Sequence, residues 1–306
     1  MKLGIVGAGT VGRACLIASV MRGMAREIVL VDRTEKKARG MVTDVSYGAV
    51  LSPSVSVRAG DYADLGGCTL VMLTIGVNEK EGGATDRSDP EGRLKLLAKN
   101  KAIFQQVVPQ IAKAAPDCIL LIVTDPPDAL ADIARGAASG LNVVSAGTYL
   151  DSLRLRVHIA RKLEMHPASV DAHLVGEHGT SEVFLWSSAR VGGAPVLEMI
   201  GGRDGAKGIE KEVREANIEI IEGTGASQLG IGMVCARIAE MVARDEHAVI
   251  PIGTYSEKYG VTLSLPSVVG RTGVVRVLTP EMTAEERRAL DESAAHIRHA
   301  LDHASG

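Results

Sequence analysis

The chain has 306 residues, 46% of them hydrophobic and 23% charged, which is typical of a globular protein with one large or two ordinary domains. Its formal net charge of -3 argues against a nucleic-acid-binding surface or a polybasic membrane-binding surface. No apolar run approaches the roughly 20 residues of a membrane-spanning helix, so we expect no membrane insertion.

The first half of the chain alternates between predicted strands and predicted helices. The strands are rich in Val, Ile and Leu, which is typical of a parallel sheet covered by helices on both faces. We therefore expect an α/β fold, a Rossmann doubly wound parallel sheet, over residues 1–146. The predicted strands cover residues 2–6, 27–31, 54–60, 69–76, 118–124 and 142–147, and the predicted helices cover residues 13–23, 34–47, 94–115 and 129–138.

The pattern changes after residue 146. Shorter predicted strands and longer helices follow, which indicates a mixed α+β domain over residues 147–306. The predicted strands cover residues 170–176, 182–192, 247–253 and 273–278, and the predicted helices cover residues 150–163, 205–223 and 228–245, with a last helix from Thr283.

The cysteine spacing predicts a reducing compartment. Cys15, Cys68, Cys118 and Cys235 lie far apart, without a Cys-x-x-Cys motif or a Cys/His cluster. We expect free buried thiols and neither disulfides nor a metal site. Met1 leads directly into the first predicted strand, which leaves no room for a targeting peptide. We therefore expect a cytoplasmic protein.

A glycine-rich turn, GAGTVG, follows the first predicted strand and opens the first predicted helix. In it Gly7 permits a tight turn, Gly9 lets the backbone approach a pyrophosphate, and Gly12 lets the helix pack closely on the sheet. Asp32 ends the next strand, twenty residues after Gly12, where a carboxylate can bind the hydroxyls of an adenosine ribose. That carboxylate repels a 2′-phosphate, so the motif favours NAD over NADP, although Arg33 beside it weakens the preference.

The segment VNEKEGGATDRSDPEGR, residues 77–93, separates a predicted buried strand from a predicted helix. Eight of its 17 residues are charged, and no face of it is apolar. Connections of this kind usually have about two to six residues, and longer ones tend to be functional lids or disordered. Gly82, Gly83 and Gly92 supply hinge freedom.

Two motifs in the second half carry side chains suited to acid–base chemistry. LVGEHGTSEVFLWSSARVGGAP places His178 between glycine-rich turns, and an imidazole, which titrates near neutrality, suits proton transfer in both directions. GTYLDSLRLR places Asp151 and Arg154 one helical turn apart and therefore on one face. Taken alone, these features also fit a structural histidine and a surface ion pair.

The motifs GAGTVG, TIG, VTDPPD, LDSLRLR and GEHGTSEV, together with Asp32 and Arg93, resemble in their order the NAD-dependent lactate/malate dehydrogenase family. The resemblance covers nearly the whole chain and is closer to lactate dehydrogenases around His178. It implies an oxidoreductase that transfers hydride between NAD and an L-2-hydroxy acid, with lactate/pyruvate ahead of malate/oxaloacetate. It also implies cofactor contacts from the glycine-rich turn, Asp32, Thr10, Val11, Thr74, Ile75, Gly76 and Thr124.

The resemblance implies a role for each candidate catalytic residue. His178 is the general base that takes the hydroxyl proton, and Asp151 holds its other ring nitrogen and stabilises the imidazolium. Arg154 clamps the substrate carboxylate with two parallel hydrogen bonds, a geometry that lysine cannot reproduce. Arg93 polarises the carbonyl oxygen, and residues 77–93 are a mobile lid that closes over the substrate.

The lid is longer than is usual in the family, so the position of its substrate-discriminating residue stays open. Counting back from Arg93 selects Arg87, which would pair with the second carboxylate of malate or oxaloacetate. Counting forward from TIG selects Glu79, which would repel that carboxylate.

Departures from the family pattern concern the substrate pocket. Asp125 stands where the family usually has an asparagine, and an ionised aspartate cannot donate a hydrogen bond. Asp125 is therefore protonated, or turned away, or faces a natural substrate with a donor or positive group near the reacting carbon. Thr180 replaces the aspartate that usually follows His-Gly, and Ser227, with Ile231 one turn later, is expected to line the nicotinamide pocket.

Alternatives therefore remain open at this stage. They are a malate dehydrogenase, a dehydrogenase for an atypical 2-keto acid, and a non-catalytic NAD-binding relative. The intact set of His178, Asp151, Arg154 and Arg93 counts against the non-catalytic relative, while Asp125 and Thr180 keep it open. NAD-dependent glycoside hydrolases share a related fold but are longer and need a metal, usually with cysteine and histidine ligands that the sequence does not cluster. The family assembles as dimers or tetramers, and we expect a homotetramer.

Overall fold

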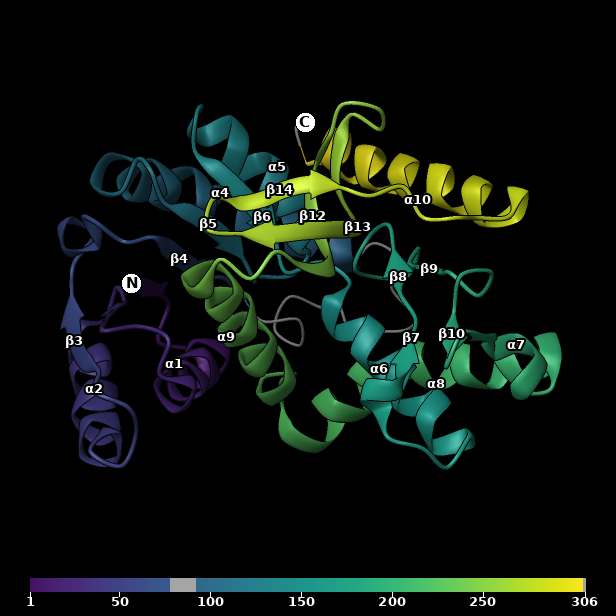
Figure 1. Cartoon of the computed structure of the whole chain (residues 1–306). Coiled ribbons are helices and arrows are strands. Elements are labelled where there is room, and N and C mark those ends of the chain that lie inside the picture. The colour runs from purple at the N-terminus through teal and green to yellow at the C-terminus, as the bar shows by residue number, and fades with distance from the viewer. Residues whose placement is uncertain (78–91, 305–306) are drawn as a thin grey trace.

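The computed structural model describes residues 1–77 and 92–304 (Figure 1). Within these residues, nine strands form one sheet in the order β14-β13-β12-β6-β5-β4-β1-β2-β3. The six strands of the first half are parallel, in the order β3-β2-β1-β4-β5-β6. This is the strand order of a Rossmann sheet, so the predicted fold is confirmed. They are β1 (Lys2–Val6), β2 (Glu27–Val31), β3 (Ser56–Gly60), β4 (Leu70–Leu73), β5 (Ile119–Ile122) and β6 (Asn142–Ser145).

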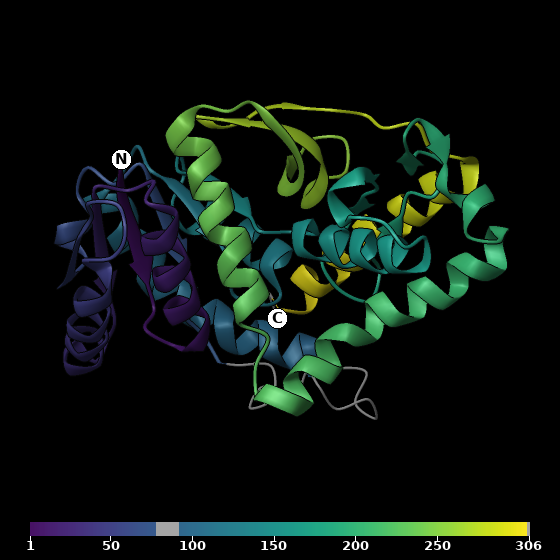
Figure 2. The same ribbon diagram turned by 60° about the horizontal axis from the view of Figure 1, so that its bottom comes forward.

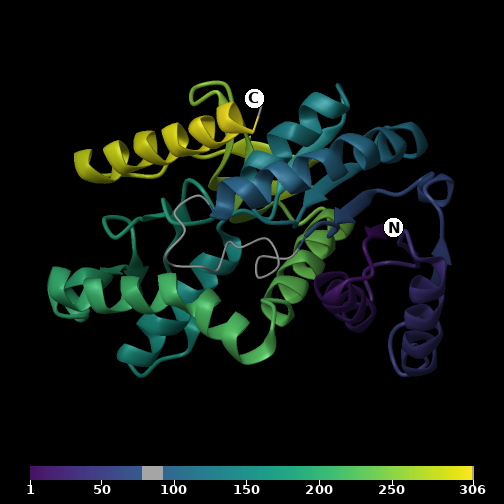
Figure 3. The same ribbon diagram turned by 180° about the vertical axis from the view of Figure 1, so that it is seen from behind.

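Helices cover both faces of this sheet (Figures 1 and 3). Helix α1 packs with the later helix α9 on one face, and α4 and α5 pack with α10 on the other. The first-half helices are α1 (Thr10–Arg22), α2 (Glu35–Ala49), the short η1 (Ala63–Leu65), α4 (Gly92–Ala114) and α5 (Pro127–Ala137). Helix α4 begins at Gly92, so it starts before Arg93 rather than after it as the sequence suggested.

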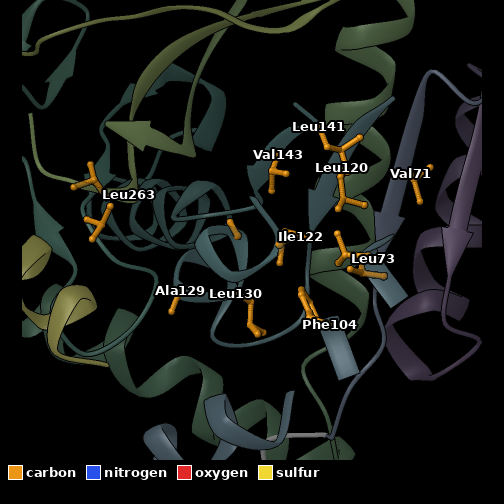
Figure 4. Packing of buried hydrophobic residues seen from close by; sticks show 14 of the residues in the cluster. Val71, Leu73, Phe104, Leu120, Ile122, Ala129, Leu130, Leu141, Val143 and Leu263 are labelled. Carbon is orange, nitrogen blue, oxygen red and sulfur yellow. The ribbon is translucent and has the colours of Figure 1, made fainter. Parts of the chain in front are cut away.

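Among the described residues, buried hydrophobic side chains form three clusters, and alternation along the central strands separates the two that pack on the sheet. Val71 and Leu73 of β4 belong to the cluster that contains Phe104 of α4 (Figure 4). Leu70 and Met72 of the same strand belong to the cluster formed with α1 and α9. Successive side chains of a strand point to opposite faces, and all four are buried because helices cover both.

The second half is mixed, as predicted, but its strands differ in detail. Its elements are α6 (Tyr149–Lys162), η2 (Pro167–Ser169), β7 (Val170–Asp171), β8 (Leu174–Val175), β9 (Val183–Phe184), β10 (Arg190–Val191), β11 (Ala194–Pro195), α7 (Val196–Met199), α8 (Gly202–Thr224), α9 (Leu229–Arg244), β12 (Ala248–Ser256), β13 (Val261–Gly270), β14 (Gly273–Val277) and α10 (Ala284–His303).

Two predicted strands are broken, and two strands, β11 and β13, were not predicted. The segment 170–176 splits because β7 pairs with β10 in one small sheet while β8 pairs with β9 in another, and the segment 182–192 splits for the same reason. Strand β13 was not predicted, and a proline in a run argues against a central strand. Pro266 lies opposite Pro251 of β12, but its carbonyl oxygen accepts a hydrogen bond of 2.8 Å from the Leu278 N–H, just past the end of β14. The N–H and the carbonyl of one residue point to the same side of an antiparallel strand, so the missing N–H of Pro266 removes no bond to β12.

The last strands join the two halves of the chain. Residue 146 directly follows β6, where the chain leaves the sheet for α6. Strand β12 then pairs antiparallel with β6, so the β12–β14 meander extends the first-half sheet (Figure 2). Helix α10 starts as predicted after Thr283, whose side chain forms a capping box with Glu286.

No single helix among the described residues is long and apolar enough to cross a membrane. The pair α8 and α9 meets that criterion only when taken together, and it bends by 115° between the two helices.

Candidate active site

A cavity of about 340 Å³ opens at the carboxyl ends of β1, β4 and β5, beside α6, α8 and α9. Ligands of doubly wound folds bind at this edge of the sheet. It brings together candidates from both halves of the chain. Its lining includes Gly9, Thr10, Val11, Thr74, Ile75, Gly76 and Thr124 from the first half, and Arg154, His178 and Ser227 from the second.

The glycine-rich turn forms a cradle at one end of this cavity. Gly7 has a φ of +113°, and a Cβ atom there would lie 2.7 Å from Oγ1 of Thr74. A Cβ atom on Gly12 would lie 1.8 Å from the carbonyl oxygen of Gly7, so α1 approaches the turn itself. A Cβ atom on Gly9 would meet nothing within 4 Å. The backbone at Gly9, the N-cap of α1, therefore faces open space where a helix N-terminus favours a phosphate.

Asp32 lies against this turn. Its Oδ2 accepts a hydrogen bond of 2.7 Å from the Ala8 N–H, and its Oδ1 accepts one of 2.9 Å from the Thr34 N–H. A carboxylate has about four acceptor positions, so these bonds leave capacity for ribose hydroxyls. The cradle and the carboxylate together fit the pyrophosphate and adenosine ribose of NAD.

The threonines of the cofactor motif hold the strand ends together. Oγ1 of Thr74 lies 3.1 Å from the carbonyl oxygens of Val6 and Gly7, and it donates toward them. Oγ1 of Thr124 donates a hydrogen bond of 2.5 Å to the carbonyl oxygen of Ile75. These bonds fix the edges of β1, β4 and β5 that line the cavity.

The candidate catalytic residues meet at the other end of the cavity. Nδ1 of His178, in the loop between β8 and β9, lies 2.5 Å from Oδ2 of Asp151 on α6. Arg154, one turn further along α6, donates a hydrogen bond of 2.8 Å to Oδ1 of Asp151 and also lines the cavity. The Asp151 side chain is only 3% exposed, so this pair is part of the site and not a surface ion pair.

The charge of Asp151 follows from its neighbours. Burial opposes its ionised form, but the charge and hydrogen bond of His178, followed by those of Arg154, hold the pKa of Asp151 below its usual range. An ionised carboxylate only accepts hydrogen bonds, so Nδ1 of His178 is the donor. Nε2 is then the ring nitrogen that can exchange a proton with a substrate.

Asp125 also faces the cavity and is not turned away from it. Its Oδ1 lies 3.9 Å from Nε2 of His178, and its side chain is 15% exposed. His178 therefore has a carboxylate near each ring nitrogen. Of the alternatives for Asp125, protonation and a donor-bearing substrate remain.

The structure adds residues that the motifs did not single out. Asp128 accepts a hydrogen bond of 2.7 Å from the backbone N–H of His178. Glu182 is a buried acid four residues after His178. Asn217 of α8 lines the cavity with Ile221, four residues later on the same helix face. Asp128 belongs to the VTDPPD motif and Glu182 to the GEHGTSEV motif, both already noted, but no local pattern distinguishes Asn217 and Ile221.

Some predicted positions lie outside what the structure describes. Arg87 and Glu79, and with them the lid register, fall outside the described residues, as does the side chain of Arg93. Ser227 and Ile231 line the cavity, as expected. Within the described residues, no group of three or more His, Cys, Asp or Glu side chains could hold a metal ion.

Comparisons with known proteins match this arrangement over the whole chain. A model of the lactate/malate dehydrogenase NAD binding domain matches residues 1–142, and one of the lactate/malate dehydrogenase alpha/beta C-terminal domain matches residues 148–305. L-lactate dehydrogenases of Deinococcus radiodurans and Thermus aquaticus are each 41% identical to the chain, over 97% of it and 97% of their own length.

Solved structures show the same similarity. A lactate dehydrogenase from a Medee basin deep-sea metagenome library aligns with a TM-score of 0.92 at 34% identity, covering 100% of this chain and 99% of its own. The minor L-lactate dehydrogenase of Enterococcus mundtii, in a ligand-bound form, aligns with a TM-score of 0.90 at 33% identity, covering 98% and 97%.

Proposed function

Because the chain belongs to the lactate/malate dehydrogenase family, we propose that it interconverts L-lactate and pyruvate with NAD. One observation carries the proposal: His178, held by the ionised Asp151, lies in the same cavity as Arg154 and the glycine-rich cradle. A proton acceptor, a carboxylate-binding group and a dinucleotide cradle are what oxidation of a 2-hydroxy acid requires.

The chemistry divides between cofactor and protein. When bound, NAD supplies the hydride acceptor or donor. His178 takes the hydroxyl proton at Nε2 during oxidation and returns it to the keto oxygen during reduction. Asp151 keeps Nδ1 protonated and stabilises the imidazolium, and Arg154 binds the substrate carboxylate and so orients the reacting carbon.

The finer assignments are part of the same proposal. Residues 1–146 bind NAD and residues 147–306 supply the catalytic groups, because the cradle comes from the first part and His178, Asp151 and Arg154 come from the second. Arg93 polarises the carbonyl oxygen and the lid segment 77–93 closes over the substrate, as the resemblance implies. A cytoplasmic location is supported by the four cysteines, all free and buried.

We also propose a homo-oligomer, with a tetramer preferred to a dimer. Exposed apolar side chains support association between copies of the chain. Ile17 and Met21 of α1 and Leu229 and Met233 of α9 are between 50% and 72% exposed. Helices α1 and α9 pack against each other, and exposed apolar groups on neighbouring elements mark association surfaces. Light scattering after size-exclusion chromatography tests this, and a monomer at micromolar concentration contradicts it.

The activity is tested by NADH oxidation with a panel of 2-keto acids. We expect the highest kcat/KM with pyruvate and a clear preference for NADH over NADPH. A higher kcat/KM with oxaloacetate would indicate a malate dehydrogenase instead. A higher kcat/KM with a bulky or amino-bearing acid would indicate a dehydrogenase for an atypical 2-keto acid. NADH binding without turnover of any acid would indicate a non-catalytic relative.

A further inference from the structure

The loop that carries His178 is held through three successive backbone N–H groups. The Gly176 N–H donates to the carbonyl oxygen of Ser264 on β13 at 2.9 Å, and the Glu177 N–H donates to Oγ of Ser293 on α10 at 2.9 Å. The His178 N–H donates to Oδ2 of Asp128 on α5 at 2.7 Å. Each N–H therefore binds a different element, and Asp128 holds the residue that bears the imidazole.

Asp128 is itself fixed on several sides. It is 1% exposed, and its Oδ1 accepts a hydrogen bond of 2.5 Å from Oγ of Ser145 at the end of β6. It lies in the first turn of α5, where the helix dipole favours a carboxylate. A Cβ atom on Gly253 of β12 would lie 2.6 Å from Oδ1 of Asp128 and 1.9 Å from Oγ of Ser145. The carboxylate therefore has little room to rotate.

We propose that Asp128 is a positioning residue for His178, holding its backbone so that the ring stays against Asp151 with Nε2 toward the cavity. The proposal rests on the proposed function, in which His178 is the base. Asp151 restrains the orientation of the ring at Nδ1 but leaves the main chain free. Asp128 restrains the main chain, and both tethers are needed because a displacement of about 1 Å can lower a rate about 100-fold.

The hydrogen bond from the His178 N–H to Asp128, which we call the tether, can form in either protonation state of Asp128. Burial raises the pKa of Asp128 to about 7, while the hydrogen bonds from Ser145 and the His178 N–H act in the opposite direction. The ionised form accepts both bonds. The protonated form still accepts from the His178 N–H through one oxygen and can donate to Oγ of Ser145 through the other. An asparagine can make the same pair of bonds, whereas leucine, of similar shape, can make neither.

Asp132 provides a matched control on the same helix. Its Oδ2 accepts a hydrogen bond of 2.8 Å from the Thr262 N–H, and its Oδ1 accepts one of 2.8 Å from the Thr262 hydroxyl. It therefore ties α5 to β13 with a backbone N–H and a hydroxyl, as Asp128 ties α5 to the His178 loop and β6. Loss of Asp132 removes these two bonds, and also its ion pair with Arg135 at 3.3 Å, without touching His178.

The experiment compares Asp128→Leu, Asp128→Asn and Asp132→Leu in the full-length protein, with pyruvate and NADH. We expect Asp128→Leu to lower kcat at least about 100-fold with little change in NADH affinity. Asp128→Asn should stay within about fivefold of the wild type, and Asp132→Leu should lose thermal stability but keep its kcat. If Asp128→Leu does not fold, Asp128→Ser, which is too short to reach His178, takes its place with the same expected loss.

Two outcomes overturn the proposal. One is a kcat in Asp128→Leu as high as in Asp132→Leu at equal stability, and the other is a kcat in Asp128→Asn as low as in Asp128→Leu. A spectroscopic measurement separates this failure from failure of the proposed function. The proton between His178 and Asp151 should give a downfield NMR signal in the wild type and in Asp128→Asn that is lost in Asp128→Leu. An unchanged signal in Asp128→Leu would show that Asp128 does not position His178. This conclusion holds even if the wild type turns over no 2-keto acid.

Discussion

His178 and Asp151 are joined by a partly buried contact of 2.5 Å between Nδ1 and Oδ2. The same carboxylate accepts a hydrogen bond of 2.8 Å from Arg154 through Oδ1. One aspartate thus orients both the proposed base and the proposed carboxylate-binding group. A substrate bound by Arg154 therefore presents its hydroxyl at a fixed place relative to Nε2 of His178.

Replacing His178 with alanine should lower kcat for pyruvate at least about 100-fold, because general acid–base catalysis contributes at least that much. NADH affinity, measured by fluorescence titration, should remain within about threefold, because His178 lies in the loop after β8 and the cradle lies in the turn after β1. Turnover close to that of the wild type would remove His178 from the mechanism.

Replacing Asp32 with alanine should raise the KM for NAD and relax the discrimination against NADP. The alanine also removes the acceptor of the Ala8 N–H, which could disturb the cradle by itself. Asp32→Asn is therefore the companion variant, since it keeps an acceptor but loses the charge that repels a 2′-phosphate. Both variants should lower the ratio of kcat/KM with NAD to kcat/KM with NADP. An unchanged ratio in both variants contradicts the assignment of Asp32 to the adenosine ribose.

Replacing Asp125 with asparagine should raise kcat/KM for pyruvate about tenfold or more, which corresponds to about 1.4 kcal/mol. An amide can donate to a keto oxygen, whereas two unit charges 4 Å apart at a typical effective dielectric repel by roughly 4 kcal/mol. A variant that loses activity with an amino-bearing acid while gaining it with pyruvate would identify a donor-bearing natural substrate. A variant equal to the wild type with every substrate would show that the position is passive.

The variants Arg87→Gln and Glu79→Gln test which of these two lid residues discriminates between substrates. If Arg87 pairs with a second carboxylate, only its loss should depress kcat/KM for oxaloacetate relative to pyruvate, because a neutral amide forms a weaker bond with a carboxylate. If Glu79 is the discriminating residue, only Glu79→Gln should raise the activity with oxaloacetate. Equal substrate ratios in both variants and the wild type would place the discriminating residue elsewhere.

Replacing Glu182 with glutamine should remove a pH-dependent loss of stability. Burial, reinforced by the charge of Asp151, raises the pKa of Glu182 from 4.5 to about 8. The folded state thus binds a proton that the unfolded state releases above about pH 4.5, so the contribution of Glu182 to stability is full below that pH and is lost as pH rises through about 8.

Chemical denaturation at about pH 5 and about pH 8 measures this effect. The free energy of unfolding of the wild type relative to Glu182→Gln should fall between them by up to about 1.4 kcal/mol per pH unit. The exposed Glu292→Gln is the control and should show no such change. A constant difference between wild type and Glu182→Gln would contradict a raised pKa.

The sequence by itself determined the Rossmann half and singled out the candidate site residues. Strand–helix alternation and the glycine-rich turn are local patterns, and their reasons are local: side-chain periodicity, the positive φ of Gly7, and the close approach of Gly12 to the carbonyl oxygen of Gly7. The order of motifs around Asp32, Asp151, Arg154 and His178 pointed to the family in the same way.

Only the tertiary structure decided how these residues act on one another. Strand β13 is held by pairing with β12 and β14. The local sequence did not predict it, because a segment that contains Pro266 does not read as a central strand. Asp128 reaches the His178 N–H across 50 residues of chain, and the raised pKa of Glu182 comes from burial beside Asp151. Burial and long-range hydrogen bonds depend on which distant elements pack together, and the residues next to a position in the sequence do not determine that packing.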